Sequence, residues 1–538
     1  MFAPGWRESA WRRLSDGFDL LVIGGGITGA GILHDAALRG LSVALVERGD
    51  FGSGTSSRSS KLIHGGLRYL RRMQLAITRT ACRERDLLAL ANPHLVFPVQ
   101  FLYPSYEHDL TPGWQVELGL SMYDHLTPVR HRHARVGADA AVELVPQLAR
   151  KGLEFGLLYD DAVADDARLV LAVVSAGMLA GGSALSYARV EGLIRSADGR
   201  IAGARVTDLE SGRSQEIRAS VVINATGVWA DEICAMGGQR RTHLRPSRGS
   251  HLLFSRASLP LDLAVTALSP DDGRPVFAVP HPEGTLVGTT DLFHDGPLDD
   301  PQPSAEEVAY LLRVAQHAFP SAGLTLRSMT GAFAGVRPVL SSRAATPSDA
   351  SREEAVWVED GLLSTAGGKL TTFRATAEKV VHAAIRLLPD ERQAQAAPGS
   401  STTFSLPWRC DPESTRAVVQ ALGVVEPVAR GMVRRLGALA LPVAASAGPP
   451  QLRPIADGLD VCGAEFVWHL HFGGCVHLED LLLRRVRLGM WRPRRCLELV
   501  PDLRPLLRRA AGWSVARWNA EVARLEKAVA NWLPPEGR

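Results

Sequence analysis

Residues 18–29 read Phe18-Asp19-Leu20-Leu21-Val22-Ile23-Gly24-Gly25-Gly26-Ile27-Thr28-Gly29, and this order of residues sets the architecture of the N-terminal part. The apolar first half is typical of a strand buried in a parallel sheet. The second half has G-x-G-x-x-G spacing, and a helix is expected from there to about Arg39, where Gly40 ends it. A second strand, residues 41–46, ends at Glu47. This succession indicates a Rossmann-type dinucleotide-binding domain.

Each part of this unit has a physical task in holding a dinucleotide. Gly24, Gly26 and Gly29 permit a tight turn and let the backbone approach a pyrophosphate. The N-terminus of the following helix offers free N–H groups and the positive end of its dipole. Glu47 can accept hydrogen bonds from ribose hydroxyls. The motif itself leaves NAD and FAD both open.

A second loop of small and hydroxyl-bearing residues follows shortly after Glu47. It reads Gly54-Thr55-Ser56-Ser57-Arg58-Ser59-Ser60-Lys61. Its backbone and side chains can donate hydrogen bonds to further phosphate and ribitol oxygens. An NAD enzyme has no need of such a loop here, so its position favours FAD over a merely flexible serine-rich loop.

The residues from Gly54 to Tyr69 resemble the signature segment of FAD-dependent glycerol-3-phosphate dehydrogenases. The matches cover residues 18 to about 385 well and thin out beyond, where residues 477–489 are similar to the helical cap domain of that family. The further matches, in chain order, are Asp165-Asp166-Ala167-Arg168-Leu169, Asn224-Ala225-Thr226-Gly227, Gly249-Ser250-His251, Gly288-Thr289-Thr290-Asp291, Gly335-Val336-Arg337-Pro338, Ser351-Arg352 and Gly367-Gly368-Lys369-Leu370-Thr371-Thr372.

This resemblance implies an FAD enzyme that oxidises sn-glycerol 3-phosphate to dihydroxyacetone phosphate by hydride transfer to the flavin. It also implies that the electrons pass on to quinone or another acceptor. No metal is expected. Motif and resemblance together predict these cofactor-binding residues: Gly24, Gly26, Gly29, Glu47, Thr55, Ser56, Ser57, Ser60, Lys61, His64, Gly65, Gly66, Ala225, Thr226, Gly227, Gly368, Lys369 and Thr371.

Oxidation of a secondary alcohol needs a base for the hydroxyl proton or a cation for the alkoxide, and a phosphate needs fixed cations. His251 is the candidate base because a neutral imidazole titrates near the working pH, and His64 competes with it. The alternative for His251 and for His64 is a structural role, in which the imidazole only forms hydrogen bonds within the fold. The resemblance implies a substrate pocket of Arg68, Tyr69, Arg337, Arg352 and Lys369, and the predicted catalytic residues are His251, Arg337, Arg352 and Lys369.

One position departs from the family pattern. Arg248 stands before Gly249-Ser250-His251, where the family often has lysine. The charge is kept, but the hydrogen-bond geometry of the side chain changes.

The length of 538 residues exceeds what one core usually covers. The predicted fold class is α/β, with a Rossmann-type FAD-binding domain, an inserted antiparallel β substrate domain and a C-terminal α-helical domain. The discontinuous FAD-binding domain is expected over residues 1–385, with the insert at about 240–340. A linker is expected over 386–403 and the helical domain over 404–538.

The composition excludes several other classes. The net charge of +3 gives no reason to expect nucleic acid, and the six scattered cysteines form no C-x-x-C pair. No apolar run reaches the ~18 residues of a membrane span, and no signal peptide is visible, so a cytoplasmic protein is expected. Peripheral contact with the inner face of the cell membrane is suggested by Trp6, Trp11 and nearby arginines, and by nine arginines in residues 484–509. A homodimer is left open.

Two rival functions remain at this point. The first is an FAD-dependent amine or amino-acid oxidase of the same fold class, because Arg337, Arg352 and Lys369 could bind a carboxylate as well as a phosphate. The second is a non-catalytic FAD-binding or tRNA-modifying protein, and the small net charge argues against it.

Overall fold

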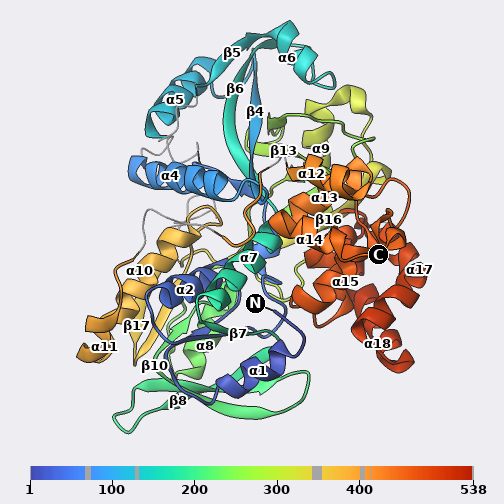
Figure 1. Ribbon diagram of the computed structural model, residues 1–538. Helices are drawn as coiled ribbons and strands as arrows, with labels where there is room; N and C mark the ends of the chain where they lie inside the picture. The colour runs from blue at the N-terminus through green and yellow to red at the C-terminus, as the bar shows by residue number, and fades with distance from the viewer. Residues whose placement is uncertain are drawn as a thin grey trace.

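The computed structural model describes residues 2–66, 74–127, 132–341, 354–399, 406–411 and 414–535. Two sheets and a C-terminal group of helices make up the molecule (Figure 1). The first sheet lies in the lower half of that view, the second extends to the top, and the C-terminal helices lie on the right.

The first sheet is the expected Rossmann-type sheet. Its strand order is β17-β18-β10-β1-β2-β7, and all neighbours are parallel except β17 and β18. All four residues of β2 are buried, as continuous apolar strands of a parallel sheet require. The strands are β1 (Phe18–Ile23), β2 (Val43–Val46), β7 (Ser183–Leu185), β10 (Ser214–Asn224), β17 (Ala355–Glu359) and β18 (Leu362–Ala366). An antiparallel extension adds β8 (Ala188–Arg195) and β9 (Ile201–Asp208) beside the first half of β10.

Three helices pack side by side against this sheet: α2 (Ile27–Leu38), α7 (Asp166–Leu179) and α10 (Phe373–Ile385) (Figure 1). A Cβ added to Gly31 of α2 would lie 3.0 Å from the Cβ of Ala377, so glycine lets α10 approach closely. Asp165 is the N-cap of α7, and its carboxylate accepts a hydrogen bond from the N–H of Arg168 at 3.0 Å. Asp165 therefore caps the N-terminus of this helix.

The second sheet has the order β15-β11-β14-β13-β12-β4-β6-β3, with β16 beside β11 and β5 beside β6. It is wider than the predicted insert at about 240–340, because β3 to β6 come from residues 62–164. Residues 96–106 and 153–164 form its longest pair without a short turn between them, so no local hairpin signal marks the pairing. The strands are β3 (Leu62–Ile63), β4 (Val96–Tyr106), β5 (Ala134–Gly137), β6 (Leu153–Ala164), β11 (Ser247–Phe254), β12 (Ala264–Leu268), β13 (Pro275–His281), β14 (Gly284–Gly288), β15 (Leu292–Phe293) and β16 (Met329–Arg337).

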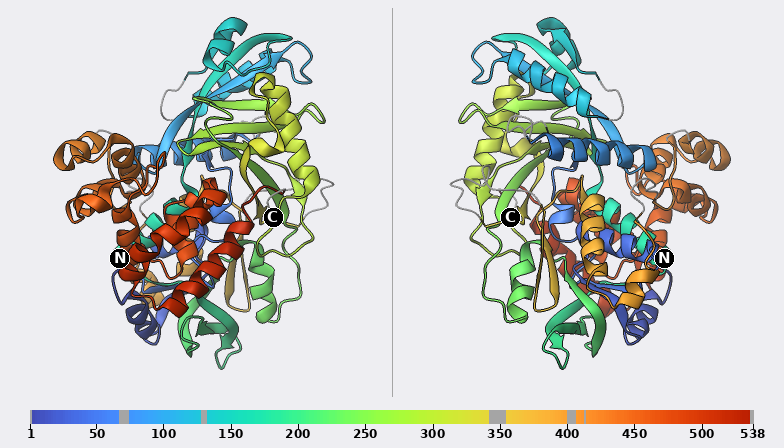
Figure 2. Two further views of the ribbon diagram at one scale, coloured as in Figure 1. Left: turned by 90° about the vertical axis from the view of Figure 1, so that its right-hand side faces the viewer. Right: turned by 90° about the vertical axis from the view of Figure 1, so that its left-hand side faces the viewer.

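Helices flank the second sheet and form the C-terminal part. α4 (Leu75–Ala91), α5 (Gly113–Leu126) and α6 (Ala138–Leu144) lie at the upper end of the molecule, and α8 (Ala230–Met236) and α9 (Ala305–Ala318) lie between strands in sequence. The short helix α11 (Asp390–Gln395) lies inside the range expected to be a linker. The C-terminal helices, which face the viewer in the left view of Figure 2, are α12 (Ser414–Leu422), α13 (Glu426–Leu436), α14 (Ala440–Ala445), α15 (Gly463–Phe472), α16 (Leu488–Trp491), α17 (Pro493–Ala511) and α18 (Val515–Ala530).

The N-terminal helix α1 (Trp6–Arg13) does not present its tryptophans to a membrane. Trp6 packs edge-on against Phe2 with ring centroids 4.8 Å apart, and Trp11 is buried. Of the nine arginines in residues 484–509, three are also buried, namely Arg484, Arg485 and Arg487. Trp11 and these three arginines therefore do not contribute to a lipid-facing surface as predicted, because tertiary packing turns their side chains inward.

All six cysteines lie within the described part of the chain and are free. Over the same residues, no helix has the length and apolar character needed to cross a membrane. No group of three or more histidine, cysteine or acidic side chains there could hold a metal ion.

His477 ties the C-terminal part to the turn after β9. Its imidazole is buried and forms ion pairs with Glu521 at 2.9 Å and Glu210 at 3.0 Å. Burial lowers the pKa of His477, but the hydrogen bonds to Glu210 and Glu521 outweigh burial and raise that pKa to about 9. The imidazolium is therefore the form that stabilises this junction at neutral pH.

We expect the thermal stability of the protein to fall as the pH rises through about 9. The pKa of His477 is higher in the folded than in the unfolded protein, so its contribution to the free energy of unfolding is complete below pH ~6.5. This contribution, up to about 3 kcal/mol, is lost as the pH rises through the folded-state pKa. Melting temperatures measured from pH 6.5 to 9.5 in wild type and His477→Gln test this. The variant should show a flatter dependence, and equal slopes would contradict the assignment.

Candidate active site

Four predicted segments meet at one edge of the Rossmann sheet. Residues 24–26 follow β1, Glu47 follows β2, residues 225–227 follow β10 and residues 367–368 follow β18. These strands are parallel neighbours, so their carboxyl ends lie at the same edge. In open α/β sheets this edge is where ligands bind.

The glycine turn leaves no room for side chains. A Cβ on Gly29 would lie 1.9 Å from the carbonyl oxygen of Gly24, and one on Gly24 would lie 2.7 Å from that of Ala225. Gly24 also has φ +108°, which L-residues rarely adopt. α2 begins directly after Gly26 without a side-chain cap, and Ser56 Oγ accepts a hydrogen bond from the N–H of Ile27 at 3.0 Å. This N-terminus with an adjacent hydroxyl suits a pyrophosphate.

Glu47 is held in place by two backbone amides. Its carboxylate oxygens accept hydrogen bonds from the N–H of Gly25 at 2.6 Å and of Gly49 at 2.7 Å. Burial raises the pKa of Glu47, and these two amides oppose that rise. Each carboxylate oxygen can accept a further hydrogen bond, as binding of ribose hydroxyls requires.

The serine-rich loop lies against the second sheet. Thr55 Oγ1 donates a hydrogen bond to the carbonyl oxygen of Val336 at 2.6 Å, and Ser60 Oγ lies 2.8 Å from His251 Nε2 in a shared hydrogen bond. A Cβ on Gly335 would lie 2.3 Å from the carbonyl oxygen of Arg58. The loop predicted to bind the cofactor therefore contacts the strands that carry the predicted substrate residues.

Two predicted cofactor residues, Lys61 and Gly65, form hydrogen bonds with other parts of the protein. Lys61 is buried, and its ammonium donates a hydrogen bond to Asp166 Oδ1 at 2.7 Å. Burial and the nearby Arg487 lower the pKa of Lys61 to about 8, against the attraction of Asp166. Gly65 donates its N–H to the hydroxyl of Tyr123 at 2.8 Å, so this amide is already used. Lys61 and Gly65 therefore connect their segment to α7 and α5, respectively.

The surroundings of His251 favour its neutral form. It stacks on Phe333 with ring centroids 4.7 Å apart, and its Nδ1 has no hydrogen-bond partner within the described ranges. Burial, together with the positive charges of Arg337 and Lys61, holds the pKa of His251 well below 6.5. A Cβ on Gly288 of the neighbouring strand would lie 2.2 Å from the ring, so glycine makes room for the imidazole.

Arg337 ends β16 with a fixed guanidinium. Nη2 donates to Thr289 Oγ1 at 3.0 Å, and Nη1 donates to Asp291 Oδ1 at 3.2 Å. A Cβ on Gly249 would lie 2.1 Å from Nη2 of Arg337, so this glycine leaves space for the guanidinium. The side chain keeps 24% of its surface exposed, which leaves it accessible to an anion. Thr289 and Asp291 belong to a segment that resembles the family but carry no predicted role. Their position as polar residues at the end of a strand is the sequence feature that indicates one.

Arg248 forms a structural ion pair. It forms an ion pair with Glu307 at 2.8 Å, and Glu307 closes the capping box of α9 with Ser304. The departure from the family's lysine therefore concerns the contact between β11 and α9.

The remaining predicted residues divide into two groups. His64 donates its N–H to Thr371 Oγ1 at 3.1 Å, so the segments after β3 and β18 lie together. Gly367 and Gly368 have φ of +84° and +77°, and Lys369 follows them half-buried. Arg68, Tyr69 and Arg352 lie outside the described residues.

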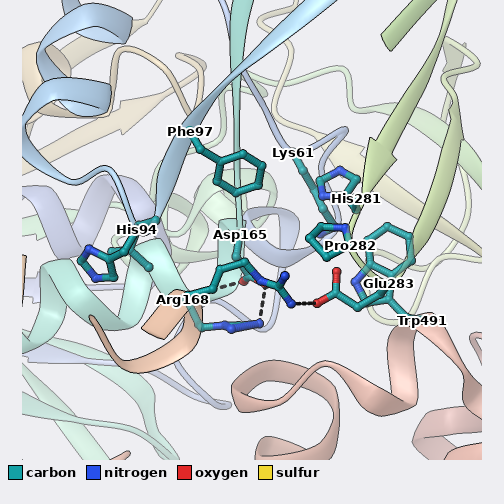
Figure 3. Close-up of a pocket in the computed structure, with 11 residues that line it drawn as sticks. Lys61, His94, Phe97, Asp165, Arg168, His281, Pro282, Glu283 and Trp491 are labelled. Carbon is teal, nitrogen blue, oxygen red and sulfur yellow. Dashed lines mark hydrogen bonds and ion pairs between the residues drawn. The ribbon is translucent and has the colours of Figure 1, made fainter. Parts of the chain in front are cut away.

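A separate small pocket, which Lys61 helps to line, lies where the second sheet meets the C-terminal helices (Figure 3). Figure 3 shows Arg168 reaching toward Asp165, and Arg434 donates to Glu283 at 2.7 Å. Lys61 is the one lining residue that had been predicted to bind the cofactor. The charges around this pocket are largely paired with one another, which distinguishes it from the sheet edge described above.

Comparison with known proteins defines the class. A model of the FAD dependent oxidoreductase family matches residues 19–398, and a model of the C-terminal domain of alpha-glycerophosphate oxidase matches residues 398–518. The protein is therefore an FAD-dependent oxidoreductase, which confirms the predicted fold class and cofactor.

The chain belongs, more narrowly, to the FAD-dependent glycerol-3-phosphate dehydrogenase family. It is 35% identical to glycerol-3-phosphate dehydrogenase 2 of Mycobacterium tuberculosis (strain ATCC 25618 / H37Rv), over 99% of this chain and 92% of the relative. It is 36% identical to glycerol-3-phosphate dehydrogenase of Mycobacterium leprae (strain TN) with the same coverage. The structure of glycerol-3-phosphate dehydrogenase from Bacillus halodurans complexed with FAD superimposes with a TM-score of 0.80 at 26% identity, over 99% of each chain.

Proposed function

We propose that this protein oxidises sn-glycerol 3-phosphate to dihydroxyacetone phosphate by hydride transfer to FAD, and that the electrons pass to quinone in glycerol and glycerophospholipid breakdown. The observation that carries this proposal is the fixed, partly exposed guanidinium of Arg337 on the sheet that also carries the neutral His251. Through Ser60, the same sheet contacts the serine-rich loop assigned to the cofactor.

When bound, FAD supplies the two-electron acceptor. Arg337 holds an oxygen of the substrate phosphate or of the developing alkoxide, with its fork oriented by Thr289 and Asp291. His251 takes the hydroxyl proton, and a phosphate dianion near Arg337 offsets the positive charge that lowers the pKa of His251. His64 is the alternative base. Arg68, Tyr69, Arg352 and Lys369 are assigned to the same pocket.

The flavin site is assigned to the turn and loops at the sheet edge. Gly24, Gly26 and Gly29 with Ser56 receive the pyrophosphate, and Glu47 receives the ribose. Thr55, Ser57, Ser60 and Gly66, with Ala225 to Gly227, His64, Gly368, Lys369 and Thr371, surround the remainder. The spacing of Gly24 and Gly29 from the neighbouring backbone supports this assignment, because a side chain at either position would obstruct the turn.

The match over residues 398–518 to the C-terminal domain of alpha-glycerophosphate oxidase favours a glycerophosphate substrate over an amine or amino acid. The names of the full-length relatives, which are dehydrogenases, favour quinone over oxygen as the acceptor.

We expect glycerol 3-phosphate to bleach the oxidised flavin band at about 450 nm under anaerobic conditions. Glycerol without phosphate should bleach it far more slowly, because the phosphate is held by charge-assisted hydrogen bonds. A soluble quinone should then restore the band faster than oxygen does. Bleaching by amino acids but not by glycerol 3-phosphate would contradict the proposed substrate and support the amino-acid oxidase alternative.

We further propose a cytoplasmic protein that contacts the inner face of the cell membrane, where quinone is dissolved. Leu110, just before α5, and Trp114 and Leu118 on α5 are 84%, 61% and 57% exposed. The spacing of four residues between Trp114 and Leu118 places both on one face of α5, and exposed tryptophan with leucine suits the interface of a bilayer.

The variant Trp114→Ser with Leu118→Ser is expected to weaken binding to anionic lipid vesicles by about tenfold or more, since two large apolar side chains no longer enter the bilayer. Leu179→Ser is the matched control, because Leu179 is 56% exposed on a different helix, α7. Vesicle co-sedimentation of the three proteins measures the effect. Equal binding of all three would exclude α5 as the contact surface.

A further inference from the structure

The two loops assigned to FAD are both joined to one segment of the C-terminal part, residues 480–487. This segment consists of a π-helical turn, Asp480–Arg485, and the two residues that follow it. Its arginines Arg484, Arg485 and Arg487 are buried and face acidic groups of the N-terminal part. These contacts join residues more than 300 positions apart in the chain.

The first junction is at the Glu47 loop. Arg485 Nη2 donates to Asp50 Oδ1 at 3.0 Å, and both Arg484 and Arg485 also contact Asp50 Oδ2. Asp50 and Arg485 have fully buried side chains. Asp50 directly follows Gly49, whose N–H holds the Glu47 carboxylate. The position of the acid assigned to ribose thus depends on a loop that is anchored from the C-terminal part.

The second junction is at the serine-rich loop. Arg487 Nη2 donates to Asp166 Oδ1 at 2.9 Å, and the same oxygen accepts a hydrogen bond from Lys61. Ser59 Oγ donates to Asp166 Oδ2 at 2.8 Å. Lys61 and Arg487 have φ of +60° and +62°, a backbone conformation that non-glycine residues keep only where surrounding contacts hold them. Asp166 therefore connects the loop to residue 487 through buried charge.

We propose that residues 480–487 are a positioning element for the cofactor: Arg485 and Arg487 hold the Glu47 loop and the serine-rich loop in the geometry that retains FAD. The inference rests on the proposed assignment of those two loops to FAD. The physical reason is that a buried arginine and its carboxylate must stay together, because either one alone would be an uncompensated charge in the interior. Displacement of this segment would therefore displace both loops.

A matched control exists inside the C-terminal part. Arg435 is buried to the same degree, and its Nη2 donates to Glu465 Oε1 at 2.7 Å and its Nη1 to Asp460 Oδ2 at 3.1 Å. Its ion-pair partners lie in the C-terminal part, not in the FAD loops. Arg435→Met should destabilise the fold as the other two replacements do, without moving the cofactor site.

The test is the rate of FAD release from purified holoenzyme, followed by the gain of flavin fluorescence on dilution into a flavin-trapping apoprotein. Each variant is measured at the same interval below its own melting temperature. We expect release at least about tenfold faster in Arg485→Met and Arg487→Met than in wild type, and within about twofold of wild type in Arg435→Met. Partial recovery is expected for Arg487→Lys, which keeps the charge. Equal release rates in all the variants would overturn the inference.

A measurement on the wild type covers the case in which a replacement prevents folding. Coupling between sites is reciprocal, so FAD binding to the apoprotein should slow amide hydrogen exchange in residues 476–490 as well as in the two loops. The peptide covering α13 is the internal control. Slowing confined to the loops would overturn the inference. Failure of the substrate proposal is separable, because FAD release and exchange do not depend on which compound reduces the flavin.

Discussion

Replacing Arg337 with methionine is expected to lower kcat/KM for glycerol 3-phosphate by about 10²- to 10³-fold while FAD remains bound. Arg337 is oriented by Thr289 and Asp291 and keeps 24% of its side chain exposed, so its charge is available to the substrate. Removal of one fixed donor to a developing oxyanion has an effect of about this size. Steady-state assays with a soluble quinone, together with the flavin absorbance of each preparation, provide the measurement.

Arg248→Met is the control for this replacement. Arg248 has a similar exposure of 21%, and its guanidinium pairs with Glu307, the acid that closes the capping box of α9. Its loss should lower the melting temperature and change kcat/KM by less than about tenfold, because it removes a structural ion pair rather than a substrate contact. Arg337→Lys should recover part of the activity, since it keeps the charge but not the fork. If Arg337→Met retained kcat/KM within tenfold, the phosphate would have to be held by other cations.

The variant Gly29→Val is expected to bind FAD about 10- to 100-fold more weakly and to be purified with much less bound flavin than the wild type. A Cβ at this position would lie 1.9 Å from the carbonyl oxygen of Gly24, so the turn must open. Overpacking of a rigid site typically costs about 1–3 kcal/mol, and here the displaced backbone is the one assigned to the pyrophosphate. The ratio of flavin to protein absorbance reports the bound FAD.

Gly119→Ala provides the comparison for Gly29. Gly119 lies in α5, has no atom within 4 Å of an added Cβ, and does not have a positive φ. This variant should carry FAD at the wild-type ratio, and a thermal scan should show that both proteins are folded. Retention of FAD by Gly29→Val at wild-type affinity would contradict the assignment of the turn.

The parts of the cofactor site that could be predicted are those in which local sequence and function coincide. Strand β1, the glycine turn, helix α2 and Glu47 lie within 30 consecutive residues, so their order alone indicated their geometry. The role of the glycines could be predicted because the atoms that exclude a side chain at Gly29 belong to the same turn. The second sheet was predicted to be antiparallel, and its pairs are antiparallel except β12 with β4. Its predicted extent was too small, because β4 and β6 pair across an interval that carries no hairpin signal.

The roles of the charged residues could not be predicted in the same way. Lys61 looked like a phosphate ligand, but burial beside Asp166 and Arg487 makes it part of a structural ion pair. Trp6 and Trp11 were predicted to contact a membrane, but Trp11 is buried and the half-buried Trp6 packs against Phe2. His251 was chosen for titration near neutral pH, whereas its burial near Arg337 keeps it neutral. Each outcome depends on neighbours that are distant in sequence.

By itself, the sequence determined the Rossmann unit, the FAD cofactor and the family, because a dinucleotide turn constrains residues that are adjacent in the chain and the family motifs follow in a fixed order. The tertiary structure alone decided which side chains remain accessible to a ligand and which are buried in ion pairs. Asp50 with Arg485, and Asp166 with Arg487, are contacts across more than 300 residues. The state of a charge depends on its burial and its partners, and both arise only when these distant segments pack together.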